Sequence, residues 1–200
     1  MNATWQPLLD WWFGADAPAG ELAARQNGLW FGYRAEQDAE ARTRFGDLTE
    51  QALNGYLGDW ASNPEGWLAL LLLLDQLPRM IHRGTPRAFA GDARALALLE
   101  RGIEQGWDRR LSAIQRVFCY MVFEHAEDLQ HQERAVQAFA VLLAEQDEAD
   151  SPAFISFLEY AKAHHRVIAR FGRFPHRNAI LGRVSTIDEL SFLAEPGSSF

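Results

Sequence analysis

The sequence contains almost no lysine and almost no cysteine. Lys162 is the one lysine among 19 basic residues, and Cys119 is the one cysteine. A single cysteine cannot form a disulfide within the chain. Because Cys119 lies in an apolar helical run, we expect it to be a small buried side chain. Since this chain uses arginine where others use lysine, an individual arginine says little about function.

Long apolar stretches are also missing. The longest apolar run, Trp67 to Leu74, is far shorter than the roughly 20 residues that a membrane helix needs. The first residues, Met-Asn-Ala-Thr-Trp-Gln, lack the basic region and apolar region of a signal peptide. These absences predict a soluble, cytoplasmic protein with no membrane partner. A formal net charge of -8 argues against nucleic acid as a partner, although binding of single-stranded RNA through arginine and aromatic residues stays a third, weaker hypothesis.

The short motifs that identify most enzyme classes are absent. The chain contains no G-x-S-x-G, Walker A, G-x-G-x-x-G or zinc-ribbon pattern. The H-E-x-x-H, C-x-x-C and H-x-H spacings of common metal sites are missing too. We therefore expect no metal and no cofactor, and the sequence leaves open whether the protein is an enzyme.

Helical periodicity is what the sequence provides. Apolar residues recur at three- and four-residue steps, and no stretch alternates as a β-strand does. We predict an all-α single domain over residues 1–200, built of stacked helical hairpins, with residues 1–6 and 195–200 frayed. The expected helices are Pro7 to Phe13, Glu36 to Trp60, Pro64 to a break or kink at Pro78, Asp92 to Gly106, a stretch from Leu111 onward, Ser151 to Phe171 and a short helix after Thr186, with a loop from Asp16 to Gly20.

Local signals mark several of the predicted helix ends. They are a cap at Ser62 or Asn63 before Pro64, a glycine just past a helix end at Gly172, and a capping box formed by Thr186 and Glu189.

The segment from Arg170 to Arg183 is positively charged, although the chain as a whole is negatively charged. It holds four arginines, a histidine and an asparagine, and no acidic residue. Pro175 favours an extended or turning backbone at Phe174, so we expect the segment to leave one helix, turn and enter another. Guanidinium groups at a helix start suit a carboxylate or a phosphate.

Two further segments place polar residues beside helices that must be buried. Asp75 to Arg87 holds Asp75 and Arg79 four residues apart, which is also the spacing of an ordinary ion pair on a helix. In the stretch after Leu111, apolar residues recur at three- and four-residue steps, and polar residues between Glu124 and Gln132 continue the same spacing. If this stretch is one continuous helix, these polar groups face inward. His164 points inward by the periodicity of its own helix. A carboxylate and an imidazole there can act as general acid and base, can form half of a metal site completed by His164, or can satisfy each other in the core.

We interpret the three segments as one candidate site. Catalytic roles fall to Glu124, His125 and His164, with His125 or Glu124 as the acid or base. The open alternative is that the arginines tie helix ends and carbonyl groups together. The candidate ligand-binding residues are Asp75, Arg79, Arg83, Asp128, Arg173, His176, Arg177, Asn178 and Arg183.

Several motifs together resemble a widespread bacterial family catalogued as domain of unknown function 924. The motifs are Leu9-Asp10-Trp11-Trp12-Phe13-Gly14, Leu73-Leu74-Asp75-Gln76-Leu77-Pro78-Arg79, Arg83-Gly84-Thr85 with Phe89-Ala90-Gly91-Asp92, Phe123-Glu124-His125-Ala126-Glu127-Asp128-Leu129, and Arg170 through Arg183 followed by Ser185-Thr186. The resemblance spans nearly the whole chain and implies a TPR-like helical fold, with no established activity. The chain departs from the family pattern at Met80, Val122 and Ala126, where Asn, Pro and Ser are common.

Two hypotheses about function follow. The first is a site for a small molecule that carries a carboxylate or phosphate, with or without catalysis. The second is a TPR-like interaction module that grips an acidic peptide or a C-terminal carboxylate in a helical groove. The oligomeric state does not follow from the sequence.

Overall fold

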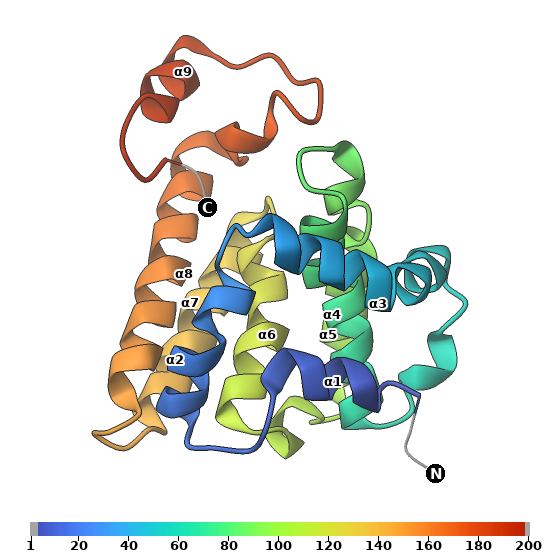
Figure 1. Cartoon of the computed structure of the whole chain (residues 1–200). Helices are drawn as coiled ribbons and strands as arrows, with labels where there is room; N and C mark the ends of the chain where they lie inside the picture. The colour runs from blue at the N-terminus through green and yellow to red at the C-terminus, as the bar shows by residue number, and fades with distance from the viewer. Residues whose placement is uncertain (1–3, 199–200) are drawn as a thin grey trace.

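The computed structural model describes residues 4–198, which fold into nine α-helices (Figure 1). No β-strand occurs in this range, so the all-α prediction is confirmed. The helices are α1 (Gln6–Phe13), α2 (Ala19–Trp30), α3 (Ala35–Asn54), α4 (Pro64–Ile81), α5 (Asp92–Glu104), α6 (Ala113–Glu124), α7 (Leu129–Ala144), α8 (Ser151–Phe171) and α9 (Ile187–Leu193). None of the helices in residues 4–198 combines the length and the apolar character that crossing a membrane requires.

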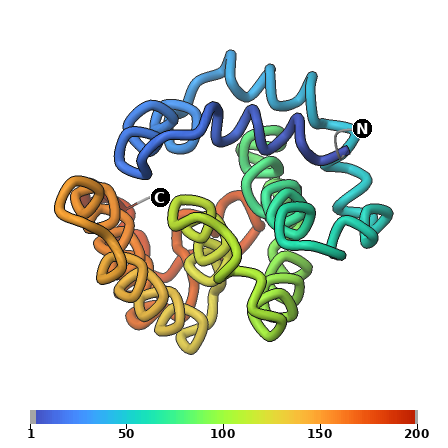
Figure 2. The backbone as a smooth tube through the Cα atoms, turned by 90° about the horizontal axis from the view of Figure 1, so that it is seen from below, coloured from blue at the N-terminus to red at the C-terminus, as the bar shows by residue number. Residues whose placement is uncertain are grey.

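Helices that follow one another in the sequence pack against each other, as stacked hairpins do. The most extensive contacts join α7 to α8, α3 to α4, α6 to α7 and α4 to α5. Seen along the helices, α7 and α8 lie on one side, α4 and α5 on the other, and α6 between them, while α1 to α3 cover one edge (Figure 2). Whether these pairs repeat in the manner of TPR proteins stays a prediction.

Helix α4 is the centre of the core because nearly all of its residues are apolar and buried. Asn63 caps it by accepting a hydrogen bond from the Gly66 amide at 2.9 Å, and Pro64 occupies its first turn, as the sequence indicates. The helix carries its buried apolar side chains past Leu77, and Asp75 and Gln76 are buried with them. Two polar side chains are therefore held inside the protein near the end of α4.

A helix end at Pro78, one of the two predicted outcomes, is wrong, because α4 continues through the proline to Ile81. Proline lacks the N–H that would bond the carbonyl of Leu74. The backbone of Gly91 packs against that carbonyl so closely that a Cβ atom at Gly91 would lie 2.0 Å from the Leu74 oxygen. Tertiary packing on the free carbonyl thus accommodates a residue that would end an isolated helix.

Three other predicted boundaries differ from the structure. Helix α3 ends at Asn54, because Gly55 adopts the left-handed conformation (φ 83°), and Trp60 belongs to a separate 3₁₀ turn. Helix α2 begins at Ala19, inside the predicted loop, and was not expected from its weak apolar pattern. The stretch after Leu111 is not one helix but two, α6 and α7, with a turn between them.

The C-terminal segment forms a small unit at the end of α8 (Figure 1). Gly172 ends α8 in the left-handed conformation (φ 68°), and Thr186 with Glu189 forms the predicted capping box of α9. Phe174 packs with Val167 and Ile168 in a cluster separate from the main core. Of the predicted frayed ends, residues 1–3 and 199–200 lie outside the described range, while Trp5 packs edge-on against Trp60 at 5.8 Å.

Candidate functional site

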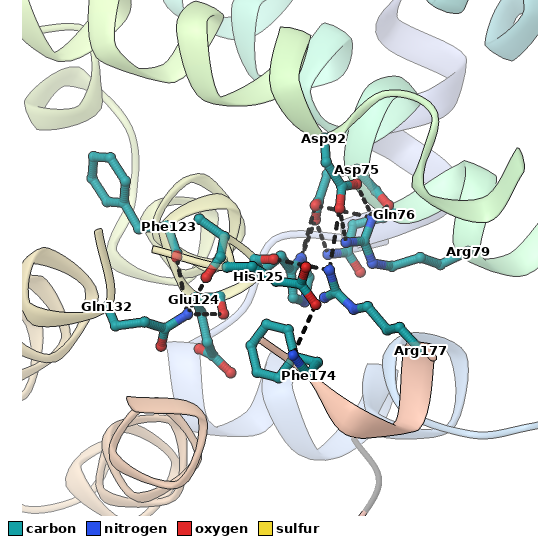
Figure 3. Close-up of polar contacts among 12 residues, drawn as sticks. Asp75, Gln76, Arg79, Asp92, Phe123, Glu124, His125, Gln132, Phe174 and Arg177 are labelled. Carbon is teal, nitrogen blue, oxygen red and sulfur yellow. Dashed lines mark hydrogen bonds and ion pairs between the residues drawn. The ribbon is translucent and has the colours of Figure 1, made fainter. Parts of the chain in front are cut away.

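The three polar segments meet in space although they are far apart in sequence (Figure 3). Asp75 comes from α4, His125 from the turn after α6, and Arg177 from the 3₁₀ turn Pro175–Arg177. The Nδ1 atom of His125 lies 2.7 Å from a carboxylate oxygen of Asp75, and Nη1 of Arg177 donates to the His125 carbonyl oxygen at 3.1 Å. The end of α4, the α6–α7 turn and the arginine-rich segment therefore share one cluster.

Asp75 is a buried carboxylate with three polar neighbours. Gln76 donates to it at 2.6 Å, Nη1 of Arg79 lies 3.2 Å away, and His125 contacts both of its oxygens. Burial by itself raises the pKa of Asp75, but the charge of Arg79 and the contact with His125 outweigh burial and lower the pKa well below its usual range. Asp75 is thus ionised and can orient the His125 ring.

His125 is held in the neutral form. Burial lowers the pKa of its imidazole more than the neighbouring Asp75 raises it. Because Asp75 can only accept a hydrogen bond, the proton of the neutral ring belongs on Nδ1, which leaves a lone pair on Nε2. Nε2 has no hydrogen-bond partner within residues 4–198. A neutral histidine oriented by a carboxylate in this way can accept a proton.

Asp92, the first residue of α5, joins two arginines. Arg79 binds its two oxygens through Nη1 and Nη2 at 2.9 and 3.0 Å, and Nη1 of Arg177 lies 3.5 Å from one of them. The aromatic ring of Phe89 lies beneath both guanidinium groups, 5.5 Å from Cζ of Arg79 and 4.8 Å from Cζ of Arg177. Asp92 and the ring of Phe89 therefore hold two positively charged guanidinium groups next to each other.

Arg177 is the most enclosed arginine of the cluster. Its side chain lies between the rings of Phe89 and Phe174, at 4.8 and 4.4 Å, and the residue is 6% exposed. Burial and the nearby charge of Arg79 lower its pKa to about 10, so it stays protonated at neutral pH. Its Nε atom is buried and has no hydrogen-bond partner among the described residues. A buried, charged donor without an acceptor is costly, and such groups call for an explanation.

A second buried pair lies next to the first. Nδ1 of His164, on α8, is 2.9 Å from a carboxylate oxygen of Glu124, at the end of α6. The rings of His125 and His164 are 6.3 Å apart. Gln132 holds the intervening turn, because its Nε2 donates to the Glu124 carbonyl oxygen at 2.6 Å.

Two further arginines of the C-terminal segment, Arg173 and Arg183, are bound to carboxylates. Arg183 contacts both oxygens of Glu127 at 2.6 and 2.9 Å, and Glu127 also accepts from the Phe174 amide at 2.8 Å. Arg173 contacts both oxygens of Glu189 at 2.6 and 2.8 Å. That contact with Arg173 helps lower the pKa of Glu189 to about 2. These contacts fix the shape of the turn.

The remaining two candidates of this turn are His176, which lies within it, and Asn178, which follows it. Asn178 is buried and donates to the Ser185 hydroxyl at 3.0 Å, while its Oδ1 accepts from no described residue. The ring of His176 lies 5.6 Å from that of Phe174, and burial together with the charge of Arg177 lowers its pKa to about 4.

Two candidates lie away from the cluster. Arg83 binds Asp38 on α3 with distances of 2.7 and 2.8 Å and lies over the ring of Tyr33. Asp128 is exposed and caps α7 by accepting from the His131 amide at 3.0 Å. The structure therefore gives both residues local roles in holding elements together.

Sequence reasoning missed Asp92 and Phe89 as members of the site. Asp92 was expected only as the start of a helix, and its partner Arg79 is 13 positions away. A signal was present, since Phe89-Ala90-Gly91-Asp92 is among the family motifs. Within residues 4–198, no group of three or more His, Cys, Asp or Glu side chains is arranged to hold a metal ion.

Comparisons with known proteins identify the family of this chain and support its all-helical fold. A family model described as "Bacterial protein of unknown function (DUF924)" matches residues 8–197. A solved structure of a protein of unknown function from Agrobacterium tumefaciens is 35% identical to this chain, with a TM-score of 0.74, over 88% of this chain and 99% of the other. No curated protein matches the sequence significantly. The chain therefore belongs to the bacterial DUF924 family, whose function is not known.

Proposed function

We propose that the cluster around Arg177 and His125 binds a small molecule that carries a carboxylate or a phosphate group. The observation that carries this proposal is the buried, charged side chain of Arg177, whose Nε has no acceptor in the described part of the chain. An anionic ligand supplies the missing acceptor.

The geometry of the guanidinium group defines how such a ligand binds. Nη1 of Arg177 is used by Asp92 and by the His125 carbonyl. Nε and Nη2 form the opposite edge, and planar oxyanions accept two parallel hydrogen bonds from that edge. The faces of the group are covered by Phe89 and Phe174, so the ligand approaches edge-on.

His125 gives the proposed site a chemical function. Its Nε2 lone pair belongs to a neutral ring oriented by Asp75, and the His125 backbone is bonded to Arg177. A ligand anchored on Arg177 therefore lies beside a group that can take a proton from it. Glu124 and His164, paired with each other, support the wall of this site, and His125 is the acid or base.

Access to the site requires movement of the C-terminal segment, because Nε of Arg177 is shielded from solvent. The segment carries Arg177 and packs in its own small cluster with the end of α8. Breaking the contacts of Glu127 with Arg183 and Phe174 opens this side of the site without unfolding α4.

A thermal-shift screen against phosphorylated metabolites and polar carboxylates that lack a long alkyl or aryl chain tests the proposal. A ligand at a hundred times its Kd stabilises the native state by about 2.7 kcal/mol. We expect one compound class to raise the melting temperature of the wild type and of Arg83→Gln, whose side chain contacts Asp38 on α3. The same class has no effect on Arg177→Gln.

The contrary result is a screen in which no compound shifts the wild type, or in which the shift survives in Arg177→Gln. The arginine-rich segment is then structural, and the alternative is the interaction module that grips an acidic peptide. Binding of an acidic peptide without any response to small anions would support that alternative.

A further inference from the structure

A hollow lies on a face of the helical body away from the Arg177 cluster. It has a volume of about 400 Å³ and is lined by the end of α3, the turn that follows it, α4 and α5. Its apolar lining includes Leu57, Leu70, Leu98 and the ring of Trp107. Ligand pockets in proteins have volumes of about 300 to 1,000 Å³, so this hollow can hold a small organic molecule. Neither Arg177 nor His125 lines it.

Two arginines of α5 give one side of the hollow a positive charge. Arg94 and Arg101 both line it, and they are seven residues apart, so they lie on the same face of the helix. Neither forms an ion pair with a carboxylate of residues 4–198. Among the described residues, Arg94 donates a hydrogen bond to the Ala52 carbonyl oxygen at 3.3 Å, and Arg101 donates one to that of Ala97 at 3.3 Å.

This combination differs from the arrangement of three other arginines of the chain. Arg79, Arg83 and Arg173 each contact both oxygens of a carboxylate, so their charges are already matched. At the hollow, apolar walls and two unmatched charges occur together, in a chain whose formal net charge is -8. Such a site complements a molecule with an apolar body and one negative end.

We propose that this hollow binds a small amphipathic carboxylate. The alkyl or aryl body packs against Leu57, Leu98 and Trp107, and the carboxylate contacts the guanidinium groups of Arg94 and Arg101. Leu74 also lines the hollow, whereas its neighbour Asp75 belongs to the Arg177 cluster. The two sites therefore lie on different faces of α4, and the second does not depend on the function proposed for the first.

Calorimetric titration with octanoate and with 2-naphthoate tests this site, with 1-octanol as the uncharged probe. We expect the wild type to bind at least one of the two carboxylates saturably at one molecule per chain. The double variant Arg94→Gln/Arg101→Gln binds it at least tenfold more weakly. The variant retains wild-type affinity for octanol, because the apolar walls are unchanged.

Two controls separate the site from general electrostatic attraction. Arg34→Gln/Arg110→Gln removes the same charge from exposed positions that do not line the hollow, and it should bind like the wild type. Leu57→Trp fills the hollow and should abolish binding of every probe. The absence of saturable binding of both carboxylates to the wild type would overturn the proposal, as would equal affinities in the wild type and in Arg94→Gln/Arg101→Gln.

Discussion

Two buried carboxylates, Asp75 and Glu124, each face a histidine. Whether a buried carboxylate lowers the stability of the fold depends on the charged and hydrogen-bonding groups around it. Asp75 has Arg79, Gln76 and His125 around it, so its charge is matched and hydrogen-bonded. A buried ion pair contributes little by itself, but removing one partner leaves the other charge unmatched. The integrity of the site and the stability of the fold therefore depend on the same side chains.

Replacing Asp75 tests this dependence. We expect Asp75→Asn to lower the free energy of unfolding by about 2 to 3 kcal/mol, because the Nδ1 proton of His125 and the Gln76 amide lose a buried charged acceptor, while Arg79 keeps its contact with Asp92. Asp38→Asn removes the partner of the partly exposed Arg83 and should cost about 1 kcal/mol or less. Urea unfolding of the three proteins measures both changes, and equal costs for the two variants would contradict the assignment.

His176 predicts how stability responds to acid. Its pKa falls from 6.5 to about 4 in the folded state. Between these values the unfolded chain binds a proton that the folded chain does not, so stability is lost as the pH falls. A shift of this size corresponds to at most about 3 kcal/mol.

We therefore expect the free energy of unfolding of the wild type to decrease steadily from pH 6.5 to pH 4. His176→Asn should show a smaller decrease over the same range. The pKa of His125 is also lowered, so some decrease should remain in the variant. Denaturant titrations at several pH values give the slope, and an unchanged slope in His176→Asn would refute the burial of a neutral ring.

At the scale of helices, the sequence predicted boundaries correctly where local chemistry decides them. Asn63 before Pro64, Gly172 after α8 and the Thr186–Glu189 box all lie where the local rules place them. These signals act within a few residues and need no knowledge of the rest of the fold.

The predictions failed where distant parts of the chain decide the outcome. Pro78 is tolerated because Gly91 packs on the carbonyl that it leaves unbonded. The residues after Glu124 form a turn, although the helical spacing continues across them, because Gln132 and the Asp128 cap stabilise the turn. Asp75, His125 and Arg177 were among the predicted site residues, but Phe89 and Asp92 were missed. The pairing of Asp92 with Arg79 depends on how α4 and α5 pack, which the sequence pattern does not show.

The close approach of α4 and the turn before α5 can be tested directly. A Cβ atom at Gly91 would meet the Leu74 carbonyl oxygen at 2.0 Å, so Gly91→Ala requires the backbone to move. We expect a loss of about 1 to 3 kcal/mol, typical of overpacking. Gly46→Ala, in α3 with only a side-chain atom at 3.9 Å, should instead gain about 0.5 to 1 kcal/mol. Thermal or urea unfolding of both variants shows whether the free energy of unfolding falls or rises. A stabilised Gly91→Ala would contradict the packing described.

For the molecule as a whole, the C-terminal segment is attached differently from the other elements. Phe174 belongs to a small cluster with the end of α8, apart from the large core that surrounds α4. Its contacts with the body include hydrogen bonds and ion pairs of Glu127 with Arg183 and the Phe174 amide, and of Arg177 with Asp92 and the His125 carbonyl. The guanidinium group of Arg177 also packs on the ring of Phe89. Elements with few buried apolar contacts open more easily than the core.

Hydrogen exchange should therefore distinguish this segment from α4. We expect amides of residues 173–198 to exchange at least tenfold faster than those of α4 in the wild type. Glu127→Gln should accelerate exchange further in residues 173–186 and leave α4 unchanged. Glu100→Gln, which removes a surface pair with Arg134, serves as the control. Peptide mass spectrometry measures the exchange. Equal protection of residues 173–198 and of α4 would contradict preferential opening of the C-terminal segment.

The most direct test of the proposed anion site is the imidazole spectrum of ¹⁵N-histidine-labelled protein, titrated with inorganic phosphate and with acetate. His125→Asn assigns the His125 signals. The proposal predicts that the Nε2 resonance of His125 moves saturably with one of the two anions in the wild type and does not move in Arg177→Gln. A His125 resonance that neither anion moves, or one that moves equally in Arg177→Gln, would contradict the proposal that Arg177 anchors a ligand beside this histidine.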